Sequence, residues 1–237
     1  MAGGGLGARA GVDAVLFDVD FTLVKPGPLL GPDGYRAAGE RHGLTLDPGR
    51  YAEARIDAVE DLRHHPELDH DEEIWVRFTE DIVRGMGGEG ARIREVAEAI
   101  TEGWLHSENF ELYEDALPVL DHLRRRGVAI GLVSNTSRDL DAFVGHFELD
   151  VDAWLSSREH GKVKPSPTIF RAALELLGVE PRAAVMVGDS PLDDIEGARA
   201  LGMQAFLIDR EGRFPERTDA LPTLLALPAL LGLADAP

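Results

Sequence analysis

Four short apolar runs punctuate the chain and are separated by segments with helical spacing. The runs are AVLF (14–17), VAIGLV (128–133), AAVMV (183–187) and AFLI (205–208), and each has the length of a strand buried on both faces. Between them, ALPVLDHLRRRG has apolar residues three and four positions apart, and SPTIFRAALELLG and SPLDDIEGARALG begin with Ser-Pro and end on glycine. This alternation predicts an α/β fold with a doubly wound parallel sheet.

Residues 26–109 do not follow this alternation, because they contain helical patterns and no convincing strand. PGRYAEARIDAVEDLRHH, DEEIWVRFTEDIVRGMGG and ARIREVAEAITEGWLHS are typical of amphipathic helices. We therefore predict an α/β core domain from residues 1–25 and 110–237, with an inserted α-helical cap domain at 26–109. The 237 residues are enough to form both.

Charge and composition narrow the possible partners. The net charge of −19 repels nucleic acid and anionic membranes, and the absence of cysteine excludes disulfides, thiolate metal sites and a cysteine nucleophile. No apolar run reaches the roughly 18 residues of a membrane span, and the first residues have no signal-peptide core. We expect a cytoplasmic protein that binds neither nucleic acid nor membrane, and the sequence leaves monomer and homodimer open.

Mostly polar residues follow three of the apolar runs. Ligands in open α/β sheets bind at these carboxyl ends of the strands. They are Asp18, Asp20 and Thr22 after the first run, Ser134 and Asn135 after the second, and Gly188, Asp189, Ser190, Asp193 and Asp194 after the third. Lys164 lies in the loop GKVKPSP between the second and third runs. We expect these side chains to converge on one site.

At least three of these residues supply carboxylates to the same small volume. Asp18 and Asp20 can face one ligand because side chains alternate along an extended segment. Together with Asp189 and a neighbour, they require a divalent cation, and oxygen ligands with open water positions suit Mg²⁺. The predicted metal residues are Asp18, Asp20, Asp189 and Asp194, with Asp193 as the alternative to Asp194.

The paired aspartates at the first strand also suit phosphoryl chemistry. A carboxylate is ionised at neutral pH, so Asp18 can attack phosphorus without a general base and form an aspartyl phosphate. Asp20 can protonate the leaving group and later take a proton from water. Donors and a cation are then needed to bind the phosphate, and the candidates are Thr22, Ser134, Asn135 and Lys164. Lys162 is the main rival of Lys164.

The motifs DVDFTL, LVSN, KVKPSP and GDSPLDD, in this order, resemble those of the haloacid dehalogenase superfamily. The resemblance covers nearly the whole chain. It implies that Asp18 is the nucleophile, that Asp20 is the acid/base and binds Mg²⁺ through its main-chain carbonyl, that Ser134 and Lys164 bind phosphate, and that Asp189 with a late aspartate holds Mg²⁺. It also implies a helical cap inserted between the first two motifs. The chain departs from the family pattern DxDGT at Phe21.

The resulting hypothesis is a Mg²⁺-dependent phosphomonoester hydrolase that acts on a small soluble phosphorylated metabolite through an aspartyl phosphate. A carbon–halogen hydrolase would need neither Asp20 nor the late carboxylates, and a phosphonate hydrolase of this superfamily would use a cap lysine, which the region from 26 to 109 lacks. A metabolite-binding or regulatory module without turnover, with Phe21 as the lesion, is the third alternative.

Several cap residues are candidates for substrate contact. They are the aromatic residues Tyr51, Trp75, Phe78 and Trp104, and either Arg55 or Arg77 for a second anionic group. The cluster HHPELDH contains His64, His65, Glu67 and His70 but lacks the HExxH spacing of zinc proteases, so we interpret it as a solvated turn.

Overall fold

A six-stranded parallel sheet forms the centre of the molecule, in a computed structural model that describes residues 11–62 and 69–233. The strand order is β5-β4-β1-β6-β7-β8, and every neighbouring pair is parallel. The strands are β1 (Ala14–Phe17), β4 (Ala129–Ser134), β5 (Ala153–Ser156), β6 (Ala184–Gly188), β7 (Gln204–Ile208) and β8 (Ala220–Leu221).

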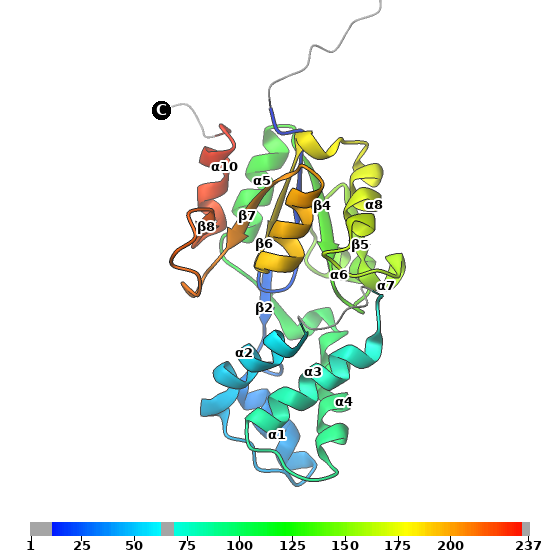
Figure 1. Ribbon diagram of the computed structural model, residues 1–237, viewed down its shortest axis with the longest axis vertical. Helices are drawn as coiled ribbons and strands as arrows, with labels where there is room; N and C mark the ends of the chain where they lie inside the picture. The colour runs from blue at the N-terminus through cyan, green and yellow to red at the C-terminus, as the bar shows by residue number, and fades with distance from the viewer. Residues whose placement is uncertain (1–10, 63–68, 234–237) are drawn as a thin grey trace, which may run out of the picture.

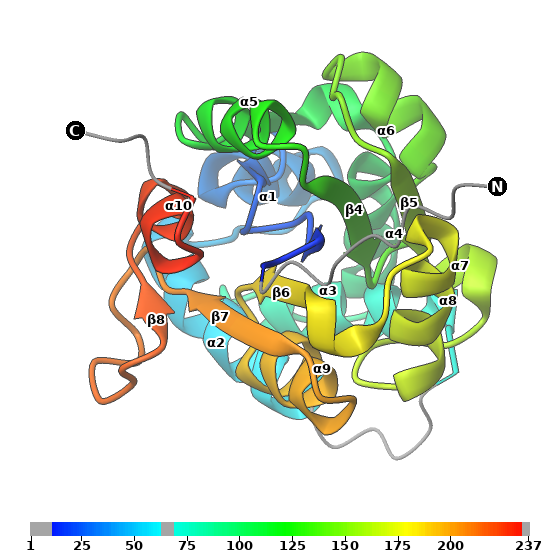
Figure 2. The ribbon, with the colours of Figure 1, turned by 90° about the horizontal axis from the view of Figure 1, so that it is seen from above.

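Helices cover both faces of this sheet (Figure 2). One face carries α5 (Ala116–Arg125), α6 (Leu140–His146) and α10 (Leu227–Leu230), and the other carries α8 (Pro167–Leu177) and α9 (Gly197–Ala200). The side chains of β1 alternate between the two: Val15 and Phe17 belong to the first apolar cluster, and Ala14 and Leu16 to the second. A strand buried on both faces has to be apolar throughout, as AVLF is.

The predicted fold class is confirmed, and the four apolar runs correspond to strands β1, β4, β6 and β7. The Ser-Pro signals also mark helix starts: the Ser166 hydroxyl accepts a hydrogen bond from the Thr168 amide at the start of α8, and Gly178 ends that helix with a φ of 67°. The edge strands β5 and β8 were not predicted, because the apolar stretch of AWLS has only three residues and AL has only two, which is shorter than the runs that mark buried strands.

A second unit, made of helices, lies beyond one end of the sheet (Figure 1). Its elements are α1 (Pro32–Arg41), η1 (Pro48–Arg50), α2 (Tyr51–Leu62), α3 (Glu72–Gly85), α4 (Ile93–Trp104) and η2 (Ser107–Asn109). We call this unit the cap and the rest of the molecule the core. The cap has its own apolar cluster, which includes Tyr35, Leu46, Ile82 and Val96.

Two kinds of connection join the cap to the core. The antiparallel strands β2 (Val24–Pro26) and β3 (Phe110–Leu112) carry the chain in and out. Beside α3, the amide of His70 donates to the carbonyl of Gly161, and the imidazole Nδ1 of His70 lies 2.9 Å from the Ser157 hydroxyl. Lys162 forms an ion pair with Asp69 at the same junction. The cap is therefore held over the carboxyl end of the sheet.

The remaining short elements complete the core. They are α7 (Ser157–His160), η3 (Pro181–Ala183), η4 (Pro191–Glu196) and η5 (Leu224–Ala226). The apolar C-terminal segment packs on the sheet through Leu224 and Leu227. Among the described residues, none of the helices combines the length and the apolar character that crossing a bilayer requires.

Candidate active site

Asp18 lies immediately after β1, with its side chain almost fully buried. Its two carboxylate oxygens have different partners: Oδ1 accepts a hydrogen bond from the Lys164 ammonium at 2.6 Å, and Oδ2 accepts one from the Thr22 hydroxyl at 3.1 Å. Thr22 was predicted to contact phosphate, but it is fully buried and does not line the cavity described below. The structure instead makes Thr22 a residue that orients Asp18.

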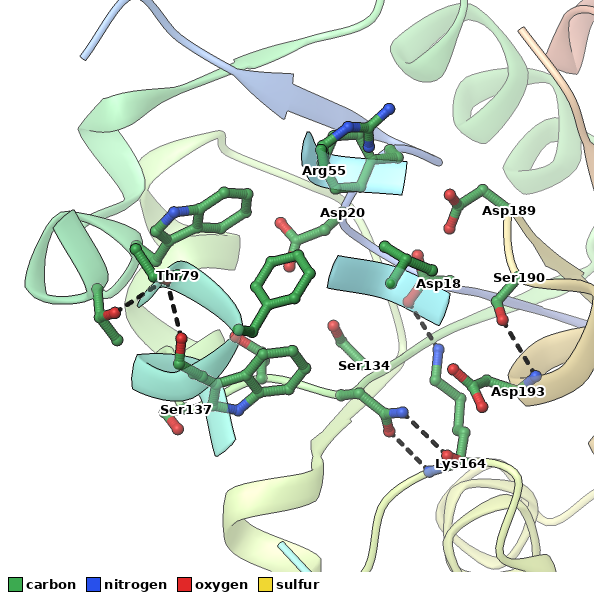
Figure 3. A pocket seen from close by; sticks show the side chains of 18 of the residues that line it. Asp18, Asp20, Arg55, Thr79, Ser134, Ser137, Lys164, Asp189, Ser190 and Asp193 are labelled. Carbon is green, nitrogen blue, oxygen red and sulfur yellow. Dashed lines mark hydrogen bonds and ion pairs between the residues drawn. The ribbon is translucent and has the colours of Figure 1, made fainter. Parts of the chain in front are cut away.

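Lys164 is fixed by contacts at both ends. Its ammonium donates to Asp18 and, also at 2.6 Å, to Asp194 Oδ1. Its backbone forms a reciprocal pair with the Asn135 side chain, in which the Lys164 amide donates to Oδ1 at 2.7 Å and Nδ2 donates to the Lys164 carbonyl at 3.0 Å (Figure 3). Asn135, a predicted phosphate ligand, thus has a positioning contact that the sequence did not reveal. The rival Lys162 is half exposed and faces Asp69.

The loop after β6 supplies two further carboxylates. Oxygens of Asp18, Asp189 and Asp194 all lie within 4.8 Å of one another. Asp194 is almost fully buried, and its Oδ2 accepts a hydrogen bond from the Ser190 amide at 3.0 Å. A Cβ on Gly188 would come within 2.2 Å of this oxygen, so only glycine leaves room for the Asp194 carboxylate there. Asp193 lines the cavity but is not part of this cluster.

Burial and charge shift the ionisation of this cluster. Burial raises the pKa of Asp18 well above its ordinary value; Lys164 opposes the rise, and Asp194 and Asp189 add to it. Burial and Asp194 raise the pKa of Asp189 to about 7, against the guanidinium of Arg213 and against Lys164. Burial alone would lower the pKa of Lys164, but Asp18 and Asp194 outweigh it and raise that pKa. The three carboxylates therefore need a further positive charge to be ionised together.

The donor set fits a divalent cation. Asp18, Asp189 and Asp194 offer only carboxylate oxygens, which are the ligands that Mg²⁺ prefers, and the part of the chain that the structure describes has no cysteine or histidine in this cluster. Arg213 already donates to Asp189 at 3.3 Å, and this contact was not predicted. The Asp20 side chain lies outside the cluster, which leaves its main chain for the metal contact that the resemblance implies.

Asp20 faces the cavity and is held by a buried arginine that sequence reasoning missed. Arg138 Nη2 donates to Asp20 Oδ1 at 2.9 Å, and its Nε donates to the Trp104 carbonyl at 3.1 Å. The guanidinium lies 3.7 Å from the centre of the Phe110 ring, and the side chain is about 1% exposed. Arg138 thus ties the predicted acid/base to the end of cap helix α4.

Phe21 stands where the family pattern has glycine, and its backbone shows why glycine is usual there. Its φ is 61°, in the left-handed region, where glycine has no steric penalty and another residue costs roughly 1–2 kcal/mol. Its amide donates to the Val24 carbonyl at 2.7 Å and closes the turn. The ring lies 6.2 Å from the Trp104 ring and 4.6 Å from the Arg55 guanidinium, both on the cap. The chain keeps this strained backbone and gains an aromatic contact with the cap.

A cavity of about 560 Å³ lies between core and cap and contains most of the predicted site. Asp18, Asp20, Ser134, Asn135, Lys164, Asp189 and Asp194 line it from the core. In Figure 3, Asp189, Ser190 and Lys164 lie at one end of the cavity and Thr79 and Ser137 at the other. The predicted carboxylates and Lys164 are therefore brought together, and the cavity extends well beyond them.

The cap candidates fall into two groups. Trp75, Phe78, Trp104 and Arg55 line the cavity, whereas Tyr51 belongs to the cap cluster and lines a neighbouring cavity of about 370 Å³. Arg77 forms an exposed ion pair with Asp71 instead. In the histidine cluster, His64, His65 and Glu67 lie outside the described residues, and His70 contacts Ser137 and Ser157.

The fold and site together define a hydrolase of the α/β class with an aspartate at its centre, and comparison with known proteins supports this. A sequence model of the haloacid dehalogenase-like hydrolases matches residues 12–202. The chain is 39% identical to a phosphoserine phosphatase of Thermus thermophilus over 155 residues, which cover 62% of this chain and 59% of that protein. It is 29% identical to the human haloacid dehalogenase-like hydrolase domain-containing protein 3 over 96% of this chain and 94% of that relative.

A solved structure extends the similarity to the whole fold. The haloacid dehalogenase phosphatase of Thermococcus onnurineus superposes with a TM-score of 0.62 at 28% identity, covering 94% of this chain and all of that one. The chain belongs to the haloacid dehalogenase-like hydrolases.

Proposed function

We propose that the chain is a Mg²⁺-dependent phosphatase that hydrolyses a small soluble phosphate monoester through an aspartyl phosphate on Asp18. The observation that carries the proposal is the buried Asp18 carboxylate, which Lys164 and Thr22 hold in the lining of a large cavity. Two of the relatives reported above are named phosphatases, and this agrees with the proposal.

The first half-reaction needs a nucleophile and an acid. An oxygen of Asp18 attacks phosphorus, and the bond between phosphorus and the leaving oxygen breaks with its electron pair on that oxygen. Asp20, in its protonated form, gives its proton to the leaving oxygen, so that an alcohol departs. Ser134 and Lys164 bind and orient the phosphoryl oxygens.

The second half-reaction reuses the same groups. Asp20, now a carboxylate, takes a proton from water, whose oxygen attacks phosphorus and releases phosphate and the free Asp18 carboxylate. Asp18, Asp189 and Asp194 would hold Mg²⁺, which when bound supplies positive charge that offsets both the carboxylates and the phosphoryl oxygens. Asn135 keeps Lys164 in place through both steps.

The alternative reactions fit this site less well. A carbon–halogen hydrolase has no leaving oxygen to protonate, whereas here Arg138 holds Asp20 toward the cavity. A phosphonate hydrolase would need a lysine from the cap, and the only lysines of the sequence are Lys25, Lys162 and Lys164.

Phosphate release from p-nitrophenyl phosphate and a panel of phosphorylated metabolites tests the proposal, with Mg²⁺ and with a chelator. Asp18→Asn is expected to lower kcat by about 10³-fold or more, because the amide is not a nucleophile. The chelator is expected to abolish turnover by the wild type. A protein that binds Mg²⁺ and turns over none of the panel would instead be a binding module.

A further inference from the structure

We propose that the physiological phosphate ester carries an uncharged, apolar body of about the size of an aromatic ring, and that Phe21 selects it. This inference rests on the proposed phosphatase function and names its substrate class. It comes from the half of the cavity that the proposed reaction does not use.

Phe21 places an aromatic ring beside the nucleophile loop. The ring is half-buried and lines the cavity. Trp104 and Arg55 of the cap flank it, at the distances given above. An apolar surface that stays partly open next to a reaction centre is a binding surface for the part of the substrate that leaves with the alcohol.

The cap continues this surface. The cavity is lined by six apolar cap side chains, each of them only partly buried: Val59, Trp75, Val76, Phe78, Trp104 and Leu105. The aromatic rings of Trp75 and Phe78 pack edge to face at 6.4 Å, which holds this wall in shape. A substrate body that covers these side chains removes apolar area from water.

The charges around the cavity disfavour a second anionic group. Each cavity arginine of the described chain already faces a carboxylate: Arg55 lies 3.5 Å from Glu211, Arg158 lies 3.7 Å from Glu72, and Arg213 lies 3.3 Å from Asp189. Glu98 and Glu102 of α4 also lie at the cavity lining, and Glu98 is paired with Arg94 at 2.7 Å. A carboxylate or second phosphate on the substrate would have to break one of these pairs and approach the glutamates.

The size of the cavity agrees with a body of this kind. Its volume of about 560 Å³ is within the range of small-molecule sites, and the end at Thr79 lies away from Asp189 and Lys164 (Figure 3). A phosphate alone fills only the end near Lys164. The remaining volume is lined by Phe21 and the six apolar cap side chains, with Thr79 and Ser137 at its far end (Figure 3), and the apolar part suits a ring.

The test compares primary alkyl phosphates, and the leaving alcohols of the decisive pair, 3-phenylpropanol and 1-propanol, have nearly equal acidity. The panel is 3-phenylpropyl phosphate, n-propyl phosphate, glycerol 1-phosphate, 4-phosphooxybutanoate and 3-aminopropyl phosphate, with Mg²⁺ present. For each enzyme, the quantity of interest is the ratio of kcat/KM for 3-phenylpropyl phosphate to that for n-propyl phosphate. This ratio does not depend on the fraction of active enzyme, so partial misfolding of a variant does not affect it.

For the wild type we expect a ratio of about 30 or more, because the phenyl ring covers Phe21 and the cap aromatic residues. Phe21→Gly and Phe21→Ala are expected to lower the ratio by about tenfold, mainly through the KM of the phenylpropyl ester. The two variants form a matched pair. Both remove the ring, but only the alanine keeps a Cβ at a φ of 61°, so an equal fall assigns the effect to the ring and not to the backbone.

Two results would overturn the proposal while leaving the phosphatase function intact. One is a wild-type kcat/KM for any other ester of the panel, glycerol 1-phosphate included, that equals or exceeds the value for 3-phenylpropyl phosphate. The other is a phenylpropyl preference that survives in both Phe21 variants. If the wild type with Mg²⁺ hydrolyses neither p-nitrophenyl phosphate nor any ester of the panel, the proposed function fails and the substrate class fails with it.

Discussion

The core and the cap line the cavity with different kinds of side chains. On the core side, polar groups contact one another: Asp18 with Lys164 and Thr22, and Lys164 with Asp194 and Asn135. On the cap side, aromatic and aliphatic side chains make up about half of the lining, beside threonines and charged residues. Other charged residues of the cap pair with one another at its exposed surface, as Arg84 does with Glu80 and Asp81.

This difference has an energetic meaning. When one partner of a buried network of polar groups is removed, the remaining groups lose much of their stabilising free energy. Exposed ion pairs contribute little free energy in comparison. Substitutions among the bonded polar groups of the core should therefore decide whether the reaction occurs. Substitutions in the apolar part of the lining, which the cap and Phe21 of the core form, should decide which ester reacts. The predictions below test this contrast, from the largest expected effect to the smallest.

Lys164→Met is expected to have the largest effect. Without the ammonium, Asp18 and Asp194 face each other with no counter-ion between them, and the pKa of Asp18 rises further from its already raised value. We expect kcat for p-nitrophenyl phosphate to fall by about 10³-fold or more. The rate of phosphate release from p-nitrophenyl phosphate in the presence of Mg²⁺, compared between the variant and the wild type, measures this fall in kcat.

Lys162→Met is the matched control, two residues away in the same loop. Its side chain is 44% exposed and its ammonium pairs with Asp69, away from the cavity lining. We expect kcat to change by less than about threefold. Equal losses in the two variants would show that the charge of the loop matters and that the position of Lys164 does not.

Asp115→Asn is expected to have the largest effect on folding. The Asp115 carboxylate accepts two hydrogen bonds from Arg210 at 2.9 Å and one from the Leu224 amide at 2.8 Å. The amide cannot pair with the Arg210 charge, so we expect the free energy of unfolding to fall by about 2 to 3 kcal/mol. Urea unfolding at pH 7 measures this change.

The same variant has a signature in the pH dependence of unfolding. Burial alone would raise the pKa of Asp115, but hydrogen bonds from Arg210, Thr223 and Leu224 outweigh it, and the pKa is lowered. A lowered pKa means that the unfolded chain binds the proton more tightly, so the contribution of Asp115 is present above roughly pH 4 and is lost as the pH falls through the folded-state pKa. The wild type should therefore lose more stability than Asp115→Asn between pH 5 and pH 3, and equal losses would contradict this assignment.

Residues adjacent in sequence account for most of what could be predicted. The apolar runs gave strands β1, β4, β6 and β7, and the residues directly after β1 and β6 include the three carboxylates that lie together. Parallel strands end at the same edge of a sheet, so polar residues that directly follow several apolar runs are predicted to share one site. Lys164 could be placed by its motif, and its burial distinguishes it from Lys162 only in the structure.

The residues that sequence reasoning missed depend on packing between distant segments. Arg138 is buried because Phe110 and Trp104 provide a ring and a carbonyl for its guanidinium, and an isolated arginine in SNTSRD has no such signal. Thr22 was predicted as a donor to phosphate, but the turn directs its hydroxyl back to Asp18. The sequence showed that Phe21 replaces the usual glycine. Only the structure shows that the backbone at this position is left-handed, which is the conformation that favours glycine.

Arg138→Met is expected to have an intermediate effect that depends on the leaving group. The variant keeps an apolar side chain between Phe110 and Phe143 but removes the donor to Asp20. Esters of alkyl alcohols need a proton from Asp20, whereas p-nitrophenolate leaves without one. We expect kcat/KM to fall by about tenfold for n-propyl phosphate and by less than about threefold for p-nitrophenyl phosphate.

A parallel loss for both esters would mean that Arg138 acts on folding or on substrate binding and not on Asp20. Thermal unfolding of the variant separates these two possibilities. Arg158→Met is the control, because Arg158 also lines the cavity and donates to a backbone carbonyl, that of Ser137, whereas in the described chain it is Arg138 that pairs with Asp20. We expect Arg158→Met to change kcat/KM for n-propyl phosphate and for p-nitrophenyl phosphate by the same factor.

Arg84→Ala is expected to have the smallest effect. Arg84 lies on α3 and makes two ion pairs at 2.6 Å, with Glu80 and Asp81, but its side chain is half exposed. Short distances do not compensate for exposure, because water screens the attraction and the long side chain loses freedom when it is fixed. We expect the free energy of unfolding to fall by less than about 1 kcal/mol, with kcat unchanged within twofold. If urea unfolding gave a loss as large as that of Asp115→Asn, surface ion pairs would stabilise the cap as strongly as buried ones stabilise the core, and the contrast between the two sides would not hold.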